Sequence, residues 1–175
     1  SMVNAKQRAV SKTTNTKATR VGERLFLDAS GPFPTGINNS KYIFGAVDDF
    51  SGKMLNAFGS TKNKMVDFVK FAFEHFKGIE KPVLYLRLDN AGEHEILKGL
   101  CREHGTVMEY IPSGTSQLNG RIERRFPVAW NKAKIYMQNA GLTEEAKEKL
   151  WPKAMSTAIL MGDLGPTQRN KIPAE

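Results

Sequence analysis

The stretch KPVLYLRLD, residues 81–89, constrains the fold more than any other part of the sequence. Its apolar run is nearly continuous, which is the pattern of a strand that is covered on both faces. Sheets of that kind carry helices on both sides and belong to the α/β class. The run meets Arg87 and then Asp89, so the pattern also places a carboxylate where a covered strand ends.

The order of the other patterns extends this prediction. RLFLDAS reads as a strand that ends at Asp28, before the breaker Gly31-Pro32. Further strand patterns are KYIFGAVDDF, KMLNAFGS and TVMEYIP. Apolar residues at helical spacing predict a helix in KNKMVDFVKFAFEHFKGI, and further helices are expected over about 95–104, from near Asn119, and over about 143–161. This order predicts a five-stranded mixed sheet flanked by helices.

The net charge favours a polyanionic partner. The 175 residues contain 26 Lys and Arg against 18 Asp and Glu, a formal charge of +8. Such an excess favours nucleic acid first and an anionic membrane second, with a merely soluble basic surface as the alternative. No run approaches the roughly 18 apolar residues of a membrane span. The single cysteine, Cys101, excludes an internal disulfide framework, so we expect the partner in the cytosol or nucleus.

The first twenty residues differ from the rest in composition. SMVNAKQRAVSKTTNTKATR is rich in Lys, Arg, Thr, Ser and Asn and poor in apolar periodicity. Segments of this kind bury too little apolar surface to fold alone. We therefore expect residues 1–20 to form a flexible basic arm or linker, and residues 21–175 to form one core domain.

Three carboxylates fall on three separate predicted elements. Asp28 ends the first strand, Asp89 follows the fourth, and Glu123 lies on the first turn or so of the long helix. Strand ends of an open α/β sheet line its binding crevice, so the three could converge. Clustered carboxylates suit Mg²⁺ or Mn²⁺, and two such ions about 4 Å apart can promote phosphoryl transfer. Spacing alone also permits acids that only cap turns.

An ordered set of segments covers nearly everything from Arg20 onward: ERLFLDASGP, KYIFGAVDDFSGK, VLYLRLDNAGEH, LCREHG, TSQLNGRIERR, LWPKAMSTAILMGDLGPT and IPAE. This set resembles the catalytic core of a retroviral-type integrase of the Ty1/copia class of retrotransposons. The resemblance implies a ribonuclease H-like fold. It also implies a catalytic triad of Asp28, Asp89 and Glu123 that holds two Mg²⁺ or Mn²⁺ ions, with Asp28 bridging them.

The sequence departs from the family pattern at two places near the triad. The interval between Asp89 and Glu123 is shorter than usual, and the shortening falls between Glu93 and Cys101, which should spare the triad. Pro127 lies inside the Glu123 helix, where proline removes a backbone hydrogen bond and clashes one turn back. Unless the helix kinks or starts late, this costs roughly 3 kcal/mol. Pro127 could therefore shift the Glu123 carboxylate.

Polar residues around Glu123 are candidates for contact with DNA. In relatives the loop before the catalytic glutamate touches donor DNA, and here it contains Gln117 and Asn119; ordinary loop residues are the alternative. Cations follow on the helix, where phosphate binding competes with a solvated helix face as the explanation. These cations are Arg121, Arg124, Arg125, Lys132 and Lys134.

Other polar and aromatic residues have simpler interpretations. We expect Asp48 and Asp49 to cap a turn or pair with a base. Trp130 and Trp151 are expected in the core or in an interface. The histidines lack the spacing of metal ligands: His75, His94 and His104.

With the resemblance, these features predict a metal-dependent polynucleotidyl transferase core, an integrase with endonuclease activity. It would trim the 3′ ends of element DNA and join them to target double-stranded DNA. Two alternatives stay open. One is a catalytically weak or inactive core that acts as a DNA-binding and assembly module. The other is a ribonuclease H-like nuclease, which fits the acids but not TSQLNGRIERR.

The resemblance also bears on assembly and location. One cysteine cannot supply the family's amino-terminal zinc domain, so we expect a core fragment or an isolated core with weak activity. Relatives associate through this core, and we expect a homodimer because several apolar positions of the two carboxy-terminal helices exceed what one copy is expected to cover. These positions are Leu150, Trp151, Met155, Ile159 and Leu160. Such an enzyme would act in the nucleus after assembly in cytoplasmic virus-like particles. We expect no membrane among its partners.

Overall fold

A central five-stranded sheet organises the computed structural model, which describes residues 17–89, 95–111 and 120–165; the side chains of residues 120–123 lie outside that description. The strands are β1 (Arg24–Ser30), β2 (Tyr42–Asp48), β3 (Met54–Gly59), β4 (Tyr85–Asp89) and β5 (Val107–Ile111). The α-helices are α1 (Met65–Gly78), α2 (Glu95–His104), α3 (Gly120–Asn139) and α4 (Glu144–Leu164). Single 3₁₀ turns η1 (Ile37–Asn39) and η2 (Lys62–Lys64) complete the described elements.

The sheet is mixed, as predicted, with the strand order β3-β2-β1-β4-β5. β1, β2 and β3 are antiparallel neighbours, whereas β4 runs parallel to β1 and β5 runs parallel to β4. Antiparallel strands can be joined by tight turns, but parallel strands need a crossover. α1 and α2 supply the two crossovers, so the predicted class, a mixed sheet with flanking helices, is confirmed.

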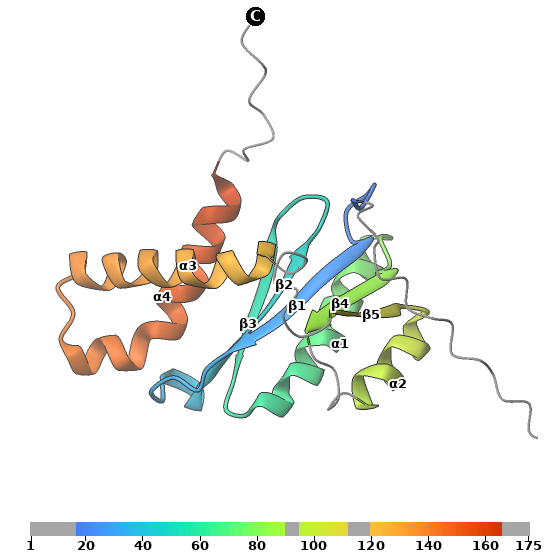
Figure 1. The fold of residues 1–175 in the computed structure, drawn as a ribbon. Helices are drawn as coiled ribbons and strands as arrows, with labels where there is room; N and C mark the ends of the chain where they lie inside the picture. Colours follow the sequence, from blue (N-terminus) through green and yellow to red (C-terminus); the bar gives the residue numbers. More distant parts are fainter. Residues whose placement is uncertain (1–16, 90–94, 112–119, 166–175) are drawn as a thin grey trace, which may run out of the picture.

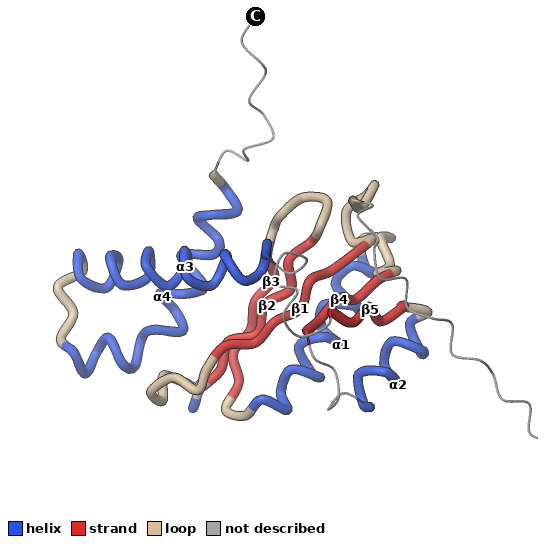
Figure 2. The backbone as a smooth tube through the Cα atoms, viewed as in Figure 1, coloured by secondary structure: helices blue, strands red, loops and turns tan. Residues whose placement is uncertain are grey.

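The helices cover the sheet in two pairs (Figure 1). α1 and α2 pack on one face, while on the other α3 lies over β1 and β2 and α4 lies over β3. Figure 2 shows the strands between these two pairs of helices. Within the described ranges, the structure contains no helix that combines the length and the hydrophobicity of a membrane span.

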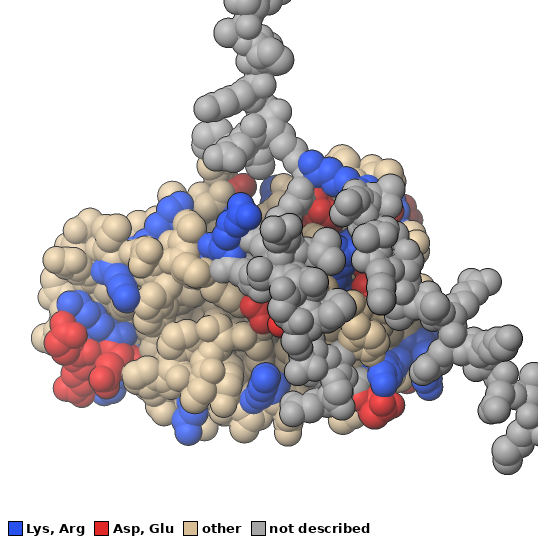
Figure 3. Space-filling model, viewed as in Figure 1, with Lys and Arg blue, Asp and Glu red and all other residues tan. Residues whose placement is uncertain are grey.

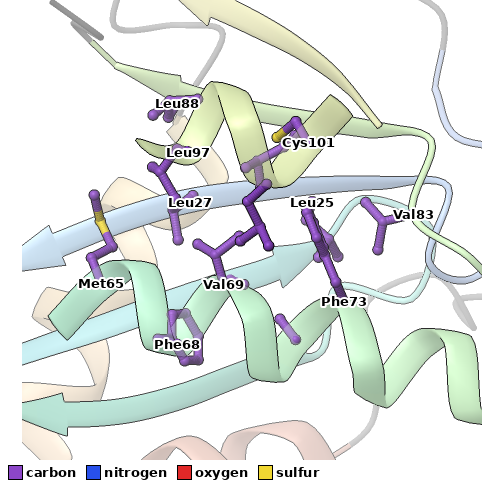
Figure 4. Packing of buried hydrophobic residues seen from close by; sticks show 14 of the residues in the cluster. Leu25, Leu27, Met65, Phe68, Val69, Phe73, Val83, Leu88, Leu97 and Cys101 are labelled. Carbon is purple, nitrogen blue, oxygen red and sulfur yellow. The ribbon is translucent and has the colours of Figure 1, made fainter. Parts of the chain in front are cut away.

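The first core lies between the sheet and the pair α1 and α2 (Figure 4). All six apolar residues that define the α1 stripe are buried, as their spacing predicted: Met65, Phe68, Val69, Ala72, Phe73 and Phe76. Alternate side chains of the strands meet them, since successive residues of a strand point to opposite faces. These strand residues are Leu25, Leu27, Phe44, Ala46, Leu86 and Leu88.

The second core lies beneath α3 and α4 and corrects one expectation. Phe26, Ile43, Val47 and Met54 face these helices, and α3 buries Phe126, Ala129, Ala133 and Met137 against them. Trp151, Met155 and Ile159 of α4 are each at most 2 % exposed within a single copy. The expectation that one copy leaves these three uncovered was wrong, because β3 and α3 cover them. Leu160, by contrast, is 58 % exposed.

Two strand boundaries also differ from the prediction. β1 continues past Asp28 to Ser30, because its antiparallel ladder with β2 runs through Ala29 and Ser30. β4 begins only at Tyr85, because the Lys81 N–H donates to the Phe76 carbonyl and Pro82 has no N–H to give. At its other end, β4 includes Asp89 as its last residue, whereas the sequence pattern placed Asp89 just beyond the strand.

The long helices begin close to where the sequence places them. α3 starts at Gly120 and runs through Pro127 to Asn139, so it continues for a further three turns beyond the proline rather than starting after it. Thr143 caps α4 by accepting a hydrogen bond from the Ala146 N–H at 3.2 Å.

At the other end of the described chain, Ala18 is buried and its N–H donates to Asp49 at 2.8 Å. Packing therefore begins before residue 21.

Candidate active site

Asp28 and Asp89 lie side by side on neighbouring strands. The parallel register pairs Leu27 with Leu88, so the two aspartates follow at the next position of each strand. Adjacent strands are about 4.8 Å apart. Because Leu27 and Leu88 face α1 and α2, alternation directs both carboxylates to the face over which α3 lies.

The environment of the two carboxylates suits a cation. Asp28 is half-buried and accepts a hydrogen bond from the Ala29 N–H at 2.8 Å, whereas Asp89 is exposed. Neighbouring carboxylates repel each other unless a proton or a cation lies between them. Oxygen donors of this kind are preferred by Mg²⁺ and Mn²⁺. The described residues contain no group of three His, Cys, Asp or Glu able to hold a metal ion, and the Glu123 side chain is not among them.

A glycine brings α3 close to Asp28. Gly45 of β2 is the antiparallel partner of Asp28, and the ring of Phe126 lies directly over it. A Cβ at residue 45 would lie 2.2 Å from Met54 Cε and 3.0 Å from Phe126 Cζ, so a larger residue would force both side chains to shift. Glu123 lies in the first turn of α3, three residues before Phe126. The structure thus places the start of the Glu123 helix beside Asp28, and the triad itself stays a prediction.

Next to the aspartates lies a buried group of charges that the sequence analysis missed, here called the β1–β5 ion cluster: Arg24, Asp49, Arg87 and Glu109. Arg24 donates to Glu109 through Nε at 3.0 Å and Nη2 at 3.2 Å, and Arg87 donates to Glu109 through Nε at 2.8 Å. Arg24 Nη1 also lies 3.5 Å from Asp49 Oδ2. The alternation of Arg24, Phe26 and Asp28, and of Arg87 and Asp89, was the signal that could have revealed it.

Burial and charge act in opposite directions on Arg24, which is 4 % exposed. Burial by itself lowers the pKa of its guanidinium, but the hydrogen bonds and charge of Glu109, with that of Asp49, outweigh it and raise the pKa. Arg24 also lies over the Tyr85 ring, at 4.9 Å, and Arg87 over the Phe26 ring, at 5.4 Å. The cluster is therefore charged, with Arg24, Arg87 and Asp49 buried and Glu109 partly buried, and both arginines pack against aromatic rings.

The acid pair at the end of β2 is structural, as predicted. Asp48 accepts hydrogen bonds from the Gly22 N–H and the Ser51 N–H, both at 2.8 Å, and from the Ser51 hydroxyl at 2.6 Å. It thereby caps the turn into β3. Asp49 pairs with a base, Arg24, and accepts the Ala18 N–H. Both roles match the sequence interpretation.

The predicted DNA-binding residues fall into three groups. Gln117 and Asn119 lie outside the described residues, as does the side chain of Arg121. Arg124, Lys132 and Lys134 are exposed on α3, and Figure 3 shows Lys and Arg side chains along that helix. Arg125 instead forms an ion pair with Asp163 of α4, which also accepts the Met54 N–H at 3.0 Å. The structure therefore gives Arg125 a partner within the protein.

The aromatic and histidine residues take structural positions. Trp151 is buried and donates from Nε1 to the Pro34 carbonyl at 2.8 Å, and Phe33 stacks on Trp130 with ring centres 5.0 Å apart. His104 contacts the Leu100 carbonyl at 3.0 Å and Glu74 at 3.2 Å. His94 lies outside the described residues. The core assignment of Trp151 is confirmed.

Comparison with known proteins identifies the fold. No family model and no curated protein sequence matches this chain. A chain of the simian T-cell lymphotropic virus intasome, solved in complex with PP2A regulatory subunit B56 gamma, matches with a TM-score of 0.61 and 14 % identity. That match covers 89 % of this chain and 53 % of the other, so this chain spans about half the length of its relative.

Two structures of the HTLV-2 integrase catalytic core domain in complex with magnesium also match. The dimeric form has a TM-score of 0.55 at 13 % identity, over 81 % of this chain and 86 % of that one. The trimeric form has a TM-score of 0.53 at 15 % identity, over 80 % and 84 %. The chain therefore has the ribonuclease H-like fold of integrase catalytic cores, as predicted.

Proposed function

We propose that this chain is an integrase-type catalytic core, a metal-dependent polynucleotidyl transferase that trims the 3′ ends of element DNA and joins them to target DNA. One observation carries the proposal: Asp28 and Asp89 occupy neighbouring strand positions on the face over which the Glu123 helix lies. The fold shared with integrase catalytic cores supports it. The element would be a Ty1/copia-class retrotransposon, which rests on the sequence resemblance.

Asp28, Asp89 and Glu123 would hold Mg²⁺ or Mn²⁺. The first two offer oxygen donors from adjacent strands, and Glu123 precedes Phe126, which packs over the strand partner of Asp28. When bound, two such ions would activate a water or 3′-hydroxyl and stabilise the leaving oxygen. The HTLV-2 cores were solved with magnesium.

The protein residues would fix and expose the reacting site. The Ala29 N–H orients one oxygen of Asp28, which lies in the middle of the sheet. Asp89 is exposed at the end of β4, where a DNA strand could reach it. Arg124, Lys132 and Lys134 would contact phosphates from α3, with Gln117, Asn119 and Arg121 nearby in sequence. Arg125 would be available only by leaving Asp163.

Assembly and location belong to the same proposal. A second copy would associate with this core, supported by exposed Leu160, Met161 and Leu164 at the end of α4. One of the HTLV-2 cores was solved in a dimeric form. As an integrase core it would act on double-stranded DNA in the nucleus, after assembly in cytoplasmic particles. Light scattering that returns only monomers at high concentration would remove the dimer and leave the catalytic proposal intact.

Cleavage of a branched DNA substrate tests the activity. With Mn²⁺, the wild type should nick or disintegrate the substrate weakly, and Asp28→Asn, Asp89→Asn and Glu123→Gln should each lower the rate by at least about 100-fold. Glu103→Gln is the matched control, because Glu103 is an exposed glutamate on α2 at the other face. Wild-type cleavage by Glu123→Gln would overturn the triad. DNA binding without turnover in the wild type would favour the assembly-module alternative.

A further inference from the structure

The β1–β5 ion cluster spans the three parallel strands just below the two aspartates. On this face the strand positions form successive rows: Arg24 with Tyr85, then Phe26 with Arg87 and Glu109, then Asp28 beside Asp89. Arg24 starts on β1, passes over the Tyr85 ring of β4 and reaches Glu109 on β5. A single side chain thus joins the outer two of three strands.

Arg87 joins the middle strand to the same acceptor. It is the register partner of Glu109 and donates to it, two residues before Asp89 on the same face of β4. Arg24 stands four residues before Asp28 on the same face of β1. Glu109 is therefore the common acceptor for the strands that carry both aspartates.

Packing alone does not explain charges at these positions. Arg24 is 4 % and Arg87 8 % exposed, so both have lost most of their hydration. Buried ion pairs seldom stabilise a protein more than apolar side chains of the same volume would. On the opposite face, the same strands use Leu25, Leu86 and Leu88, which pack without any charge. An ion pair instead fixes the relative orientation of the two strands that carry it, because an arginine and a carboxylate bind each other in a defined geometry.

We propose that the β1–β5 ion cluster is a positioning element, in which Glu109 holds β1 and β4 in the register that keeps Asp28 and Asp89 at metal-binding separation. The metal part of this inference rests on the proposed function. Arg87 and Arg24 act through the strands, with no contact to the metal required. Groups that orient metal ligands typically change metal affinity by about 10- to 100-fold when they are removed.

Metal titration gives the first test. Mn²⁺ binding is measured by calorimetry on the full chain for the wild type, Glu109→Gln and Arg87→Lys, the last keeping the charge but losing the planar group. We expect about 10- to 100-fold weaker binding in both variants. Val69→Ala is the control, since it destabilises the buried face of α1 at the opposite side of the sheet and should leave the affinity within about twofold. Unchanged affinity in a folded Glu109→Gln would overturn the proposal.

Amide hydrogen exchange without metal gives the second test. In Glu109→Gln, exchange should accelerate at least about tenfold in the β1–β4 and β4–β5 ladders and stay within about threefold in the β2–β3 ladder. Equal rates in all ladders would overturn the positioning role. If the wild type binds no Mn²⁺ through Asp28, the proposed function fails, and the exchange rates still decide the role of the cluster. Arg87→Lys serves for both measurements if Glu109→Gln does not fold.

Discussion

The two faces of the sheet use the same strands and differ sharply in chemistry. Toward α1 and α2, β1 and β4 present only apolar residues: Leu25, Leu27, Leu86 and Leu88. Toward α3, four of the alternate positions of the same two strands are charged, namely Arg24, Asp28, Arg87 and Asp89, and the others are Phe26, Ser30 and Tyr85. The antiparallel part of this second face, at β2 and β3, contributes Ile43, Val47 and Met54 to the apolar core beneath α3 and α4, which Phe26 of β1 joins.

The difference shows how a small domain can hold a charged site on a central sheet. Burial of apolar surface stabilises the folded state by about 25 cal/mol per Å², and the continuous first face supplies much of the buried apolar surface. The parallel half of the second face is then free to carry carboxylates and the ions that position them. We expect changes on the first face to alter stability, and changes on the charged half to alter metal and DNA binding.

Truncation on the first face should have the largest effect. Phe73→Ala removes a side chain that is 2 % exposed in the middle of the first core, so the free energy of unfolding should fall by about 3–5 kcal/mol. Phe71→Ala, on the same helix but with the side chain 55 % exposed, should change it by at most about 0.5 kcal/mol. Urea unfolding measures both. Similar losses for the two variants would contradict the assignment of Phe73 to the first core.

The thiol of Cys101 reports on the same face. Burial raises its pKa to about 11, from an ordinary value of 9.0. At pH 8 its reaction with a disulfide reagent should therefore be at least about 100-fold slower in the folded protein than in urea. Because the folded state binds this proton more tightly, stability should fall as pH rises from 9 to 11, and Cys101→Ala should lessen that fall. Rapid reaction at pH 8 would show that this face opens.

DNA binding through the exposed cations of α3, the helix over this second face, should respond to salt. Arg124→Ala and Lys132→Ala should each reduce the slope of log K for DNA against log salt by about 0.9, because one phosphate contact is lost. Deleting residues 1–16, which spares the packed Ala18, should lower the slope further without changing the response to metal. Binding measured by fluorescence anisotropy decides this. A slope that is flat in the wild type would mean that the net charge serves only solubility.

The smallest effect is expected at the cap of α4. Thr143→Ala removes the hydrogen bond from the Ala146 N–H and should cost about 1 kcal/mol of unfolding free energy, whereas Thr143→Ser should retain most of it. The urea midpoint measures the loss. Mn²⁺ binding should not change in either variant, because Thr143 follows the end of α3 that is opposite to its start beside Asp28. A change in metal binding would show that the apolar and charged parts of the second face are coupled.

Local pattern predicted most of the fold, because each element carries its own signal. The α1 stripe from Met65 to Phe76 and the whole of α2 followed from helical spacing. What failed depended on partners distant in sequence. The extension of β1 to Ser30 follows from β2, and the burial of Trp151 follows from Pro34 and β3, neither of which local periodicity encodes.

The candidate site was predictable only in part for the same reason. Asp28 and Asp89 were identified from their strands, and the register then placed them side by side. Glu109 was overlooked because its partners, Arg24 and Arg87, lie 85 and 22 residues away. Likewise, no local pattern marks Gly45, because its position beneath the Phe126 ring depends on α3, which lies far away in sequence.

Metal-dependent stability tests the central claim most directly. Melting of the wild type is followed with and without Mn²⁺, beside the double variant Asp28→Asn, Asp89→Asn. A ligand at 100 times its Kd stabilises the folded state by about 2.7 kcal/mol, so the wild-type Tm should rise by several degrees. In the double variant the rise should vanish, because both described carboxylates are gone. An equal rise in both proteins would contradict the placement of the metal site between β1 and β4.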